Sequence, residues 1–281
     1  MKSAKCVQIA KGTIEYSLEG DGAPVLVLHG GHSSCRETFG RGALLKAGFA
    51  VLTPSRPGYG QTSVSVGKTA ADAADSMISL LDALQIDKVA VIAISAGGLT
   101  GLHLAATYPE RVSKLVLESA VTQTWLSPDD ATYKIARKLF HPRTERLTWG
   151  MLKRLVRLFP RFVFRQMAPS FSTLPMKEVM RTLSEEDLAL FQQMIERQSS
   201  GAGFMLDLDH HIEAGVIDTI TVPTLIVHSP HDNAVPFAHA RHAHQRIPQS
   251  ELLQANTWGH LIWLGADAQR IKAKINAFLL D

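Results

Sequence analysis

The chain has 281 residues, of which 46% are hydrophobic and 20% are charged, and its formal net charge is +3. This balance is typical of a soluble globular protein with a large core, and it gives no argument for a nucleic-acid partner. The two cysteines, Cys6 and Cys35, exclude a disulfide framework, and no run reaches the roughly 18 apolar residues of a membrane span. Residues 1–11 show no signal-peptide pattern, so we expect a cytoplasmic protein.

Strand and helix patterns alternate in the first part of the chain. The predicted strands are short apolar or β-branched runs closed by turn residues, and they cover residues 13–18, 25–29, 49–53, 88–94 and 114–118. The run at residues 25–29 is apolar throughout, which is typical of a strand covered on both faces. Predicted helices cover residues 69–84 and 96–108, and Thr69 with Asp72 forms a start that resembles a capping box.

The alternation stops in the middle of the chain and then resumes. Residues 121–210 have a helical pattern that five prolines interrupt. Further along, predicted strands cover residues 224–228 and 251–254, and predicted helices cover residues 237–246 and 261–279. Repeated βα units indicate a mostly parallel sheet with right-handed crossovers. We therefore predict an α/β core at residues 1–120 and 211–281, with a helical cap inserted at residues 121–210.

Ser95 is the strongest functional signal. It ends the buried strand predicted at residues 88–94, and small residues and a helical pattern follow it at once. A sharp strand-to-helix turn of this kind exposes a serine hydroxyl and is hard to justify by packing alone. We interpret Ser95 as a nucleophile, which needs a base within hydrogen-bond reach and a group that orients the base.

His260 and Asp232 are the candidates for these two roles. Each follows a predicted strand, at the edge where open parallel sheets place their ligands. His260 precedes the last predicted helix, and Asp232 lies 28 residues before it. Glu118, at the end of another predicted strand, is the rival orienting acid. Structural alternatives are a helix cap for His260, a turn residue for Asp232 and a buried or capping carboxylate for Glu118.

Backbone donors for an oxyanion are predicted at Gly31 and Ala96. The apolar strand at residues 25–29 runs into His29-Gly30-Gly31-His32, where glycine lets the backbone approach a substrate closely. Ala96 follows the nucleophile at the start of a helix, where N–H groups are free. His32 lies beside this loop and is a candidate substrate contact.

Taken together, these motifs resemble those of the α/β-hydrolase family from about residue 13 to residue 280. The resemblance rests on features in the family's order, namely His29-Gly30-Gly31, the turn at residues 56–60, Ser95, Asp232 and His260. The family's Gly-x-Ser-x-Gly pattern is here Ala93-Ile94-Ser95-Ala96-Gly97, with alanine where a small residue is required. A serine nucleophile argues against the family's dehalogenases and epoxide hydrolases, which the resemblance would require to carry an aspartate.

The resemblance implies acyl transfer through Ser95, with no metal and no cofactor. The first hypothesis is hydrolysis of a small or medium carboxylic ester, a lactone or a thioester. Because one triad serves many reactions, carbon–carbon bond hydrolysis, peptide cleavage, perhydrolysis and lyase chemistry stay open, as does a non-catalytic ligand receptor. The expected partner is a small molecule, and the oligomeric state is not predicted.

The predicted cap carries an unusual charge. Residues 131–170 hold ten lysines and arginines against one acid, Glu145, so this segment has a charge of +9 and the remainder −6. The favoured interpretation is a cap, broken at Pro160, that buries its apolar residues over the site and exposes its arginines. Contact with an anionic lipid surface or attraction of an anionic substrate are the alternatives.

Two clusters of polar residues were weighed as metal or substrate sites. His239, His242 and His244 lie on one predicted helix with no carboxylate among them, which favours a surface or capping role. A second cluster lies where the predicted cap returns to the core and consists of Asp207, Asp209, His210 and His211. There we favour a hinge held by hydrogen bonds.

Overall fold

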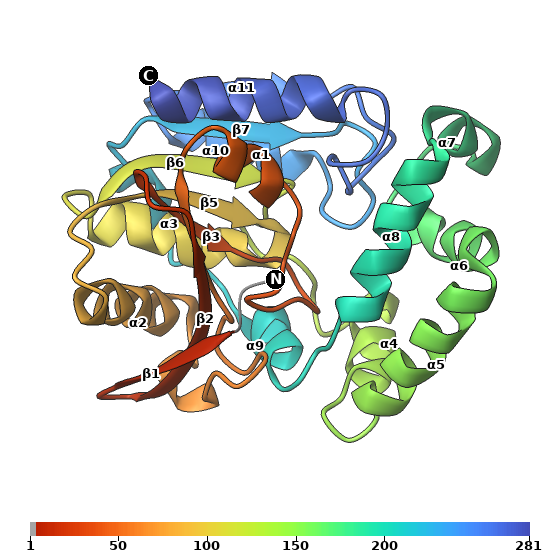
Figure 1. The fold of residues 1–281 in the computed structure, drawn as a ribbon, viewed down its shortest axis with the longest axis horizontal. Helices are drawn as coiled ribbons and strands as arrows, with labels where there is room; N and C mark the ends of the chain where they lie inside the picture. Colours follow the sequence, from red (N-terminus) through yellow and green to blue (C-terminus); the bar gives the residue numbers. More distant parts are fainter. Residues whose placement is uncertain (1–3) are drawn as a thin grey trace.

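An eight-stranded sheet forms the centre of the computed structural model, which describes residues 4–281 (Figure 1). The strand order is β1-β2-β4-β3-β5-β6-β7-β8. In chain order the strands are β1 (Lys5–Ile9), β2 (Gly12–Glu19), β3 (Pro24–Leu28), β4 (Ala50–Pro54), β5 (Val89–Ile94), β6 (Val112–Glu118), β7 (Thr224–His228) and β8 (Ser250–Gln254). Only the pairs β1–β2 and β2–β4 are antiparallel, so the predicted mostly parallel sheet is confirmed.

Helices cover both faces of the sheet because the central strands are apolar on both sides. In β5, Val91 and Ala93 enter one buried cluster, whereas Ile92 and Ile94 enter the other. On the first face lie α2 (Ala70–Ala83), α3 (Gly98–Thr107) and α10 (Ala238–Arg246), and on the second lie α1 (Arg41–Lys46) and α11 (Ala268–Leu280). The predicted α/β-hydrolase architecture is thereby confirmed.

Six further helices are inserted between β6 and β7. They are α4 (Ala131–Leu139), α5 (Glu145–Leu158), α6 (Pro160–Met167), α7 (Met176–Thr182), α8 (Glu185–Arg197) and α9 (Gly203–Asp209). Figure 1 shows α4–α8 as a lobe at one end of the sheet, whereas α9 lies close to the core. Apolar side chains of the lobe, such as Trp149 and Phe164, join the same buried cluster as Trp258 of the core. The division into core and cap at residues 120 and 210 stays a prediction.

The structure differs from the sequence prediction in three local elements. Strand β1 and helix α1 were not predicted, because one is largely exposed and the other is only six residues long. The last helix begins at Ala268 and not at residue 261, since Gly265 adopts a left-handed backbone with φ of 99° that interrupts a helix. The predicted cap of α2 is present, with Thr69 accepting from the Asp72 N–H.

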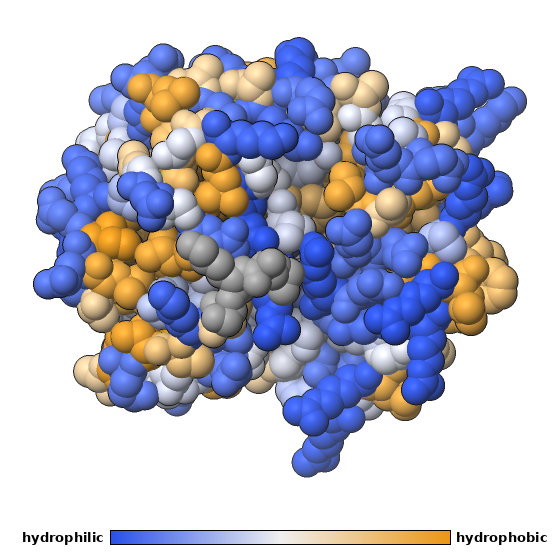
Figure 2. Space-filling view, in the orientation of Figure 1, coloured by the Kyte–Doolittle hydropathy of each residue, from blue (hydrophilic) through white to orange (hydrophobic). Residues whose placement is uncertain are grey.

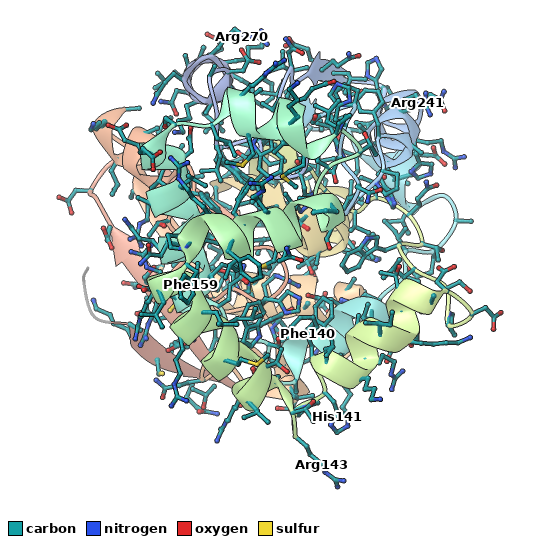
Figure 3. The ribbon with its side chains drawn as sticks, turned by 90° about the vertical axis from the view of Figure 1, so that its right-hand side faces the viewer. Phe140, His141, Arg143, Phe159, Arg241 and Arg270 are labelled. Atoms are coloured by element: carbon teal, nitrogen blue, oxygen red, sulfur yellow. The ribbon has the colours of Figure 1, made fainter. Side chains whose placement is uncertain are left out.

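The outer surface of the lobe is both basic and apolar, which corrects the prediction that its apolar residues are buried. Met151, Leu158, Phe159 and Phe162 are 56%, 70%, 57% and 57% exposed. Figure 2 shows hydrophilic side chains projecting from this lobe beside hydrophobic surface, and Figure 3 shows Phe159 and Arg143 on the face turned to the viewer. Within residues 4–281, none of the helices has the length and apolar content that crossing a membrane requires.

Candidate active site

Ser95 lies at a strained turn between β5 and α3. Its φ is 49°, a left-handed conformation that a non-glycine residue rarely adopts and that costs roughly 1–3 kcal/mol. The turn is tight because the backbone of β3 lies beside it: a Cβ at Gly97 would come within 2.6 Å of the Leu28 carbonyl oxygen. Such a turn holds the hydroxyl at the carboxyl end of the sheet, as the sequence predicted.

The alanine that replaces the first glycine of the elbow pattern is accommodated by a second glycine. Ala93 on β5 faces Gly101 on α3, and a Cβ at Gly101 would lie 2.5 Å from the Ala93 Cβ. The crowded space between strand and helix therefore holds one methyl group, which residue 93 supplies instead of residue 101. The departure from the family's pattern leaves the geometry of the turn intact.

His260 lies within hydrogen-bond reach of Ser95 and Asp232. The distance from Ser95 Oγ to His260 Nε2 is 3.0 Å, and that from His260 Nδ1 to Asp232 Oδ2 is 2.7 Å. The His260 backbone is held on both sides, because its N–H donates to the Phe171 carbonyl and its own carbonyl accepts from Ser119 Oγ. With Nδ1–H donating to the carboxylate, Nε2 is left to accept the serine proton.

Asp232 is buried and held as a carboxylate. Its Oδ1 accepts from the N–H groups of Ala234 and Val235 at 2.9 and 2.8 Å, and Oδ2 also lies 3.1 Å from His228 Nε2. Burial opposes ionisation, but the charge of His260 and the hydrogen bonds from His228 and His260 outweigh it and lower the pKa of Asp232 to about 2. An ionised Asp232 keeps the imidazole in the orientation that a base requires.

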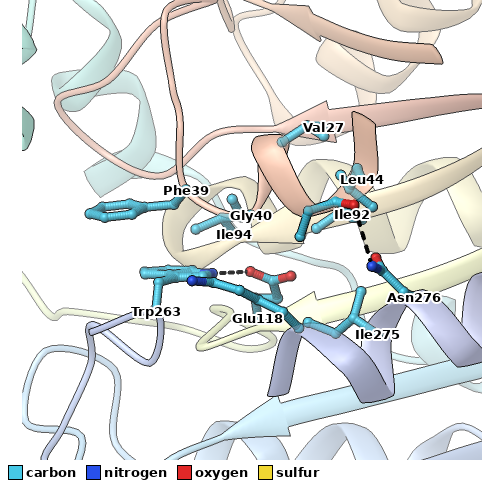
Figure 4. Close-up of a pocket in the computed structure, with 12 residues that line it drawn as sticks. Val27, Phe39, Gly40, Leu44, Ile92, Ile94, Glu118, Trp263, Ile275 and Asn276 are labelled. Atoms are coloured by element: carbon cyan, nitrogen blue, oxygen red, sulfur yellow. Dashed lines mark hydrogen bonds between the residues drawn. The ribbon is translucent and has the colours of Figure 1, made fainter. Parts of the chain in front are cut away.

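Glu118 lies near this site but does not contact His260 Nδ1. Figure 4 shows its carboxylate accepting from the indole N–H of Trp263, at 2.5 Å, beside a cavity of about 10 Å³ that is too small for a substrate group. Phe39 stacks on the Trp263 ring. Burial raises the pKa of Glu118 to about 7, although the indole hydrogen bond stabilises the ion. Of the two rival acids, the structure brings only Asp232 to the histidine.

The loop that carries Gly31 is fixed by a buried histidine and arginine. His29 accepts from the Arg56 N–H at Nε2 (2.9 Å), and its Nδ1 lies 2.7 Å from the Gly30 carbonyl, so Nδ1 carries the proton. Burial, aided by Arg56, lowers the pKa of His29 to about 3. The N–H groups of Gly31 and Ala96 lie in this loop and in the first helical turn after Ser95, where helices leave such donors free.

Arg56 also anchors the inserted helices to the core, a contact that the sequence analysis did not identify. Its guanidinium binds both carboxylate oxygens of Asp207 on α9, at 2.5 and 2.7 Å, and Tyr59 donates to the same carboxylate. Arg56 and Asp207 are both buried, and the ion pair outweighs desolvation and lowers the pKa of Asp207. The hydrogen bonds predicted near residue 207 are therefore present, with the turn at residues 56–60 as their partner, and the role of this segment as a hinge stays a prediction.

His32 lines the cavity above Ser95 as an uncharged side chain. Its ring packs against Phe204, Phe140 and Trp149, with centroid distances of 3.9, 4.3 and 5.2 Å. Ser200 Oγ accepts from the Trp149 indole and lies 2.8 Å from His32 Nδ1, so a hydrogen bond holds the imidazole in place on its Nδ1 side. Burial lowers the pKa of His32 to about 3.

A cavity of about 590 Å³ opens above Ser95, between the sheet and the inserted helices. Gly30, Gly31, Ser95 and His260 form its floor. Its walls are rich in aromatic rings from both parts of the chain, namely Phe39, Trp125, Phe140, Trp149, Phe171, Phe204 and Trp263. This size and lining are typical of a site for a small organic molecule.

Two histidines of the helix α10 contact Thr122, because His242 Nδ1 lies 3.3 Å from Thr122 Oγ1 and His239 bonds to the backbone of the same residue. His239 is buried, with Nδ1 accepting from the Thr122 N–H, whereas His244 is exposed and lies 3.0 Å from Ser250 Oγ. Of the predicted surface or capping role, the surface part is wrong for His239, which is buried and bonded to Thr122 of the inserted segment. In the part of the chain that the structure describes, no group of three or more metal-ligating side chains is assembled.

Comparison with known proteins defines the family. A profile described as alpha/beta hydrolase fold matches residues 23–266, and the chain belongs to this family. It is 46% identical over 270 residues to the uncharacterized hydrolase YcgS of Bacillus subtilis, with 95% of each chain covered. It is 27% identical to a 2-hydroxy-6-oxononadienedioate/2-hydroxy-6-oxononatrienedioate hydrolase of a Pseudomonas species, over 94% of this chain and 93% of the relative.

Solved structures agree with this assignment. An alpha/beta hydrolase fold protein from Nakamurella multipartita superposes with a TM-score of 0.83 at 25% identity, over 99% of both chains. An esterase from Exiguobacterium antarcticum gives a TM-score of 0.75 at 22% identity, over 99% of this chain and all of the other. At this identity the second likeness shows the fold alone.

Proposed function

We propose that the chain is a serine hydrolase that cleaves small or medium carboxylic esters through an acyl-enzyme on Ser95. One observation carries the proposal: Ser95, His260 and Asp232 form a continuous hydrogen-bonded chain at the floor of a cavity large enough for a small molecule. Lactones and thioesters would follow the same steps. Membership of the alpha/beta hydrolase family supports a hydrolytic reaction.

The geometry supports a two-step mechanism. His260 Nε2 takes the proton of Ser95 as Oγ bonds to the ester carbonyl carbon, and the N–H groups of Gly31 and Ala96 stabilise the oxyanion. His260 then gives the proton to the departing alcohol as the carbon–oxygen bond breaks. A water molecule repeats the sequence on the acyl-enzyme and releases the acid. Asp232 stabilises the imidazolium that forms in each step, and His32 contacts the substrate from the wall.

Labelling with a fluorophosphonate probe tests the nucleophile. We expect wild type to be labelled and Ser95→Ala to be unlabelled, because the probe reacts with an activated serine. Asp232→Asn is expected to lower kcat/KM for a p-nitrophenyl ester by about 10⁴-fold, whereas Glu118→Gln keeps activity close to wild type. Equal labelling of wild type and Ser95→Ala, or a larger loss in the Glu118 variant, would contradict the proposal.

The other reactions of the family remain distinguishable alternatives. Carbon–carbon bond hydrolysis, peptide cleavage, perhydrolysis and lyase chemistry would use the same side chains, and the dienedioate hydrolase among the relatives is named for another substrate. A panel of esters, lactones and amino-acid amides ranks them by kcat/KM. Tight binding of a ligand without turnover of any substrate would favour a receptor instead.

A further inference from the structure

The cavity above Ser95 is nearly devoid of charge. Neither lysine nor arginine is among its lining residues, all of which lie in the described part of the chain, and the only acid is Glu37. This contrasts with the outside of the same helices, where residues 131–170 carry ten basic side chains. The basic residues of the lobe are therefore absent from the cavity wall, whereas Phe140 and Trp149 of the lobe belong to it.

His32 does not supply the missing positive charge. Its imidazole is enclosed by three aromatic rings and bonded to Ser200, and burial lowers its pKa to about 3. As a neutral ring in the cavity wall, it can form a hydrogen bond with an uncharged polar group of a substrate but brings no positive charge. A neutral imidazole gives little compensation to a carboxylate that has lost its water.

Glu37 is fixed in the cavity wall by its own chain. Its Oε1 accepts from the N–H groups of Thr38 and Phe39 at 2.6 and 3.0 Å, and Oε2 accepts from Ser33 Oγ at 2.8 Å. Arg197 reaches Thr38 Oγ1 in the same loop but is not part of the lining. An anionic substrate group would therefore meet a fixed carboxylate and no cation.

We propose that this site selects esters whose acyl and alcohol parts are uncharged and apolar, and that it rejects substrates carrying a carboxylate. The inference rests on the proposed ester hydrolysis and narrows its substrate class. It separates this chain from the Pseudomonas relative, whose name specifies a dioate. The exposed arginines do not overturn it, because fields of exposed charges are largely screened beyond about 8 Å at physiological salt.

A matched pair of substrates tests the inference. p-Nitrophenyl hexanoate and mono-p-nitrophenyl adipate have the same chain length and leaving group, and differ by a terminal carboxylate. We expect kcat/KM to be about 100-fold higher for the hexanoate, because like charges face each other in a desolvated site. Equal rates, or a preference for the adipate, would overturn the inference while leaving ester hydrolysis in place. Failure of both substrates together with failure of fluorophosphonate labelling would instead remove the proposed function.

Two variants assign the selectivity to the cavity. Glu37→Gln removes the fixed charge, keeps one amide oxygen to accept from the loop N–H groups and places an amide NH₂ near Ser33 Oγ. It is expected to lower the ratio of kcat/KM for hexanoate over adipate by roughly tenfold. Glu186→Gln removes the same charge from the exposed start of α8 and is the matched control, with an unchanged preference expected. An equal effect of the two variants would mean that overall charge, not the cavity, sets the selectivity, and would refute the role of Glu37.

Discussion

Replacing Glu118 by glutamine tests how the fold tolerates a buried carboxyl group beside the site. Glu118 is 3% exposed, and within residues 4–281 its side chain accepts a hydrogen bond only from Trp263. Glutamine Oε1 can accept the same indole N–H, so the substitution removes the ionisable group and keeps the contact. The Glu118→Gln variant therefore isolates the free energy of placing a charge at this position.

The expected effect follows from the pKa of Glu118. Burial raises it from 4.5 to about 7, against the opposing hydrogen bond from Trp263. Because each tenfold change in an ionisation constant is worth about 1.4 kcal/mol, ionising Glu118 in the folded chain costs about 3 kcal/mol more than in the unfolded chain. Because the pKa of Glu118 is higher in the folded chain, its protonated form contributes its full stability below about pH 4.5. This contribution is lost as the pH rises through about 7.

Urea unfolding at about pH 5 and about pH 8 measures the difference. We expect Glu118→Gln to unfold with nearly the wild-type free energy at the lower pH and to be about 2–3 kcal/mol more stable at the higher pH. Glu110→Gln, at an exposed position, is the control and should follow wild type at both. Parallel pH dependence of wild type and Glu118→Gln would refute the argument from burial.

Two further predictions concern the inserted helices. Asp207→Ala leaves Arg56 buried without its partner and should lower the free energy of unfolding by about 3–5 kcal/mol in urea titrations. Asp209→Ala, which removes an exposed carboxylate, is the control and should lower it by less than about 1 kcal/mol. Similar losses in the two variants would contradict the role of the Arg56–Asp207 pair as an anchor. Because Phe159 is exposed beside basic side chains, we expect the protein to co-sediment with vesicles that contain acidic lipid, and we expect Phe159→Ser to bind these vesicles several-fold more weakly. Vesicle binding that does not change when acidic lipid is added would exclude this contact.

Local signals were sufficient to predict most of the sheet and the three side chains that meet at its carboxyl edge. Strands such as β3 and β5 are apolar on both faces, and Ser95, Asp232 and His260 each follow a strand, at the edge where parallel strands end together. Given the strand order of the α/β-hydrolase fold, these three residues are therefore expected to lie close together. The choice of Asp232 over Glu118 also agrees with the observed distances, while the catalytic roles stay predictions.

Contacts between distant, unpatterned segments could not be predicted. Arg56 and Asp207 are 151 residues apart, and nothing in either segment marks the other as its partner. The aromatic lining of the cavity was hidden for a similar reason, because Trp149 and Phe204 have no common period and meet only when the lobe packs on the core. Sequence patterns report which face of an element is apolar, and they do not report which other element covers it.

The buried pair of Arg56 and Asp207 has a consequence for the way ligands enter and leave. Gly58 reinforces it, since its carbonyl accepts from the N–H groups of Ala202 and Gly203 at the start of α9. Separating α9 from the core would leave a buried charge without its counterion, at a cost in free energy of several kcal/mol. Thermal fluctuations of the folded state therefore rarely break this contact. Motions that open the lobe are therefore expected to leave α9 in place against the core, so that the rest of the lobe moves relative to this helix.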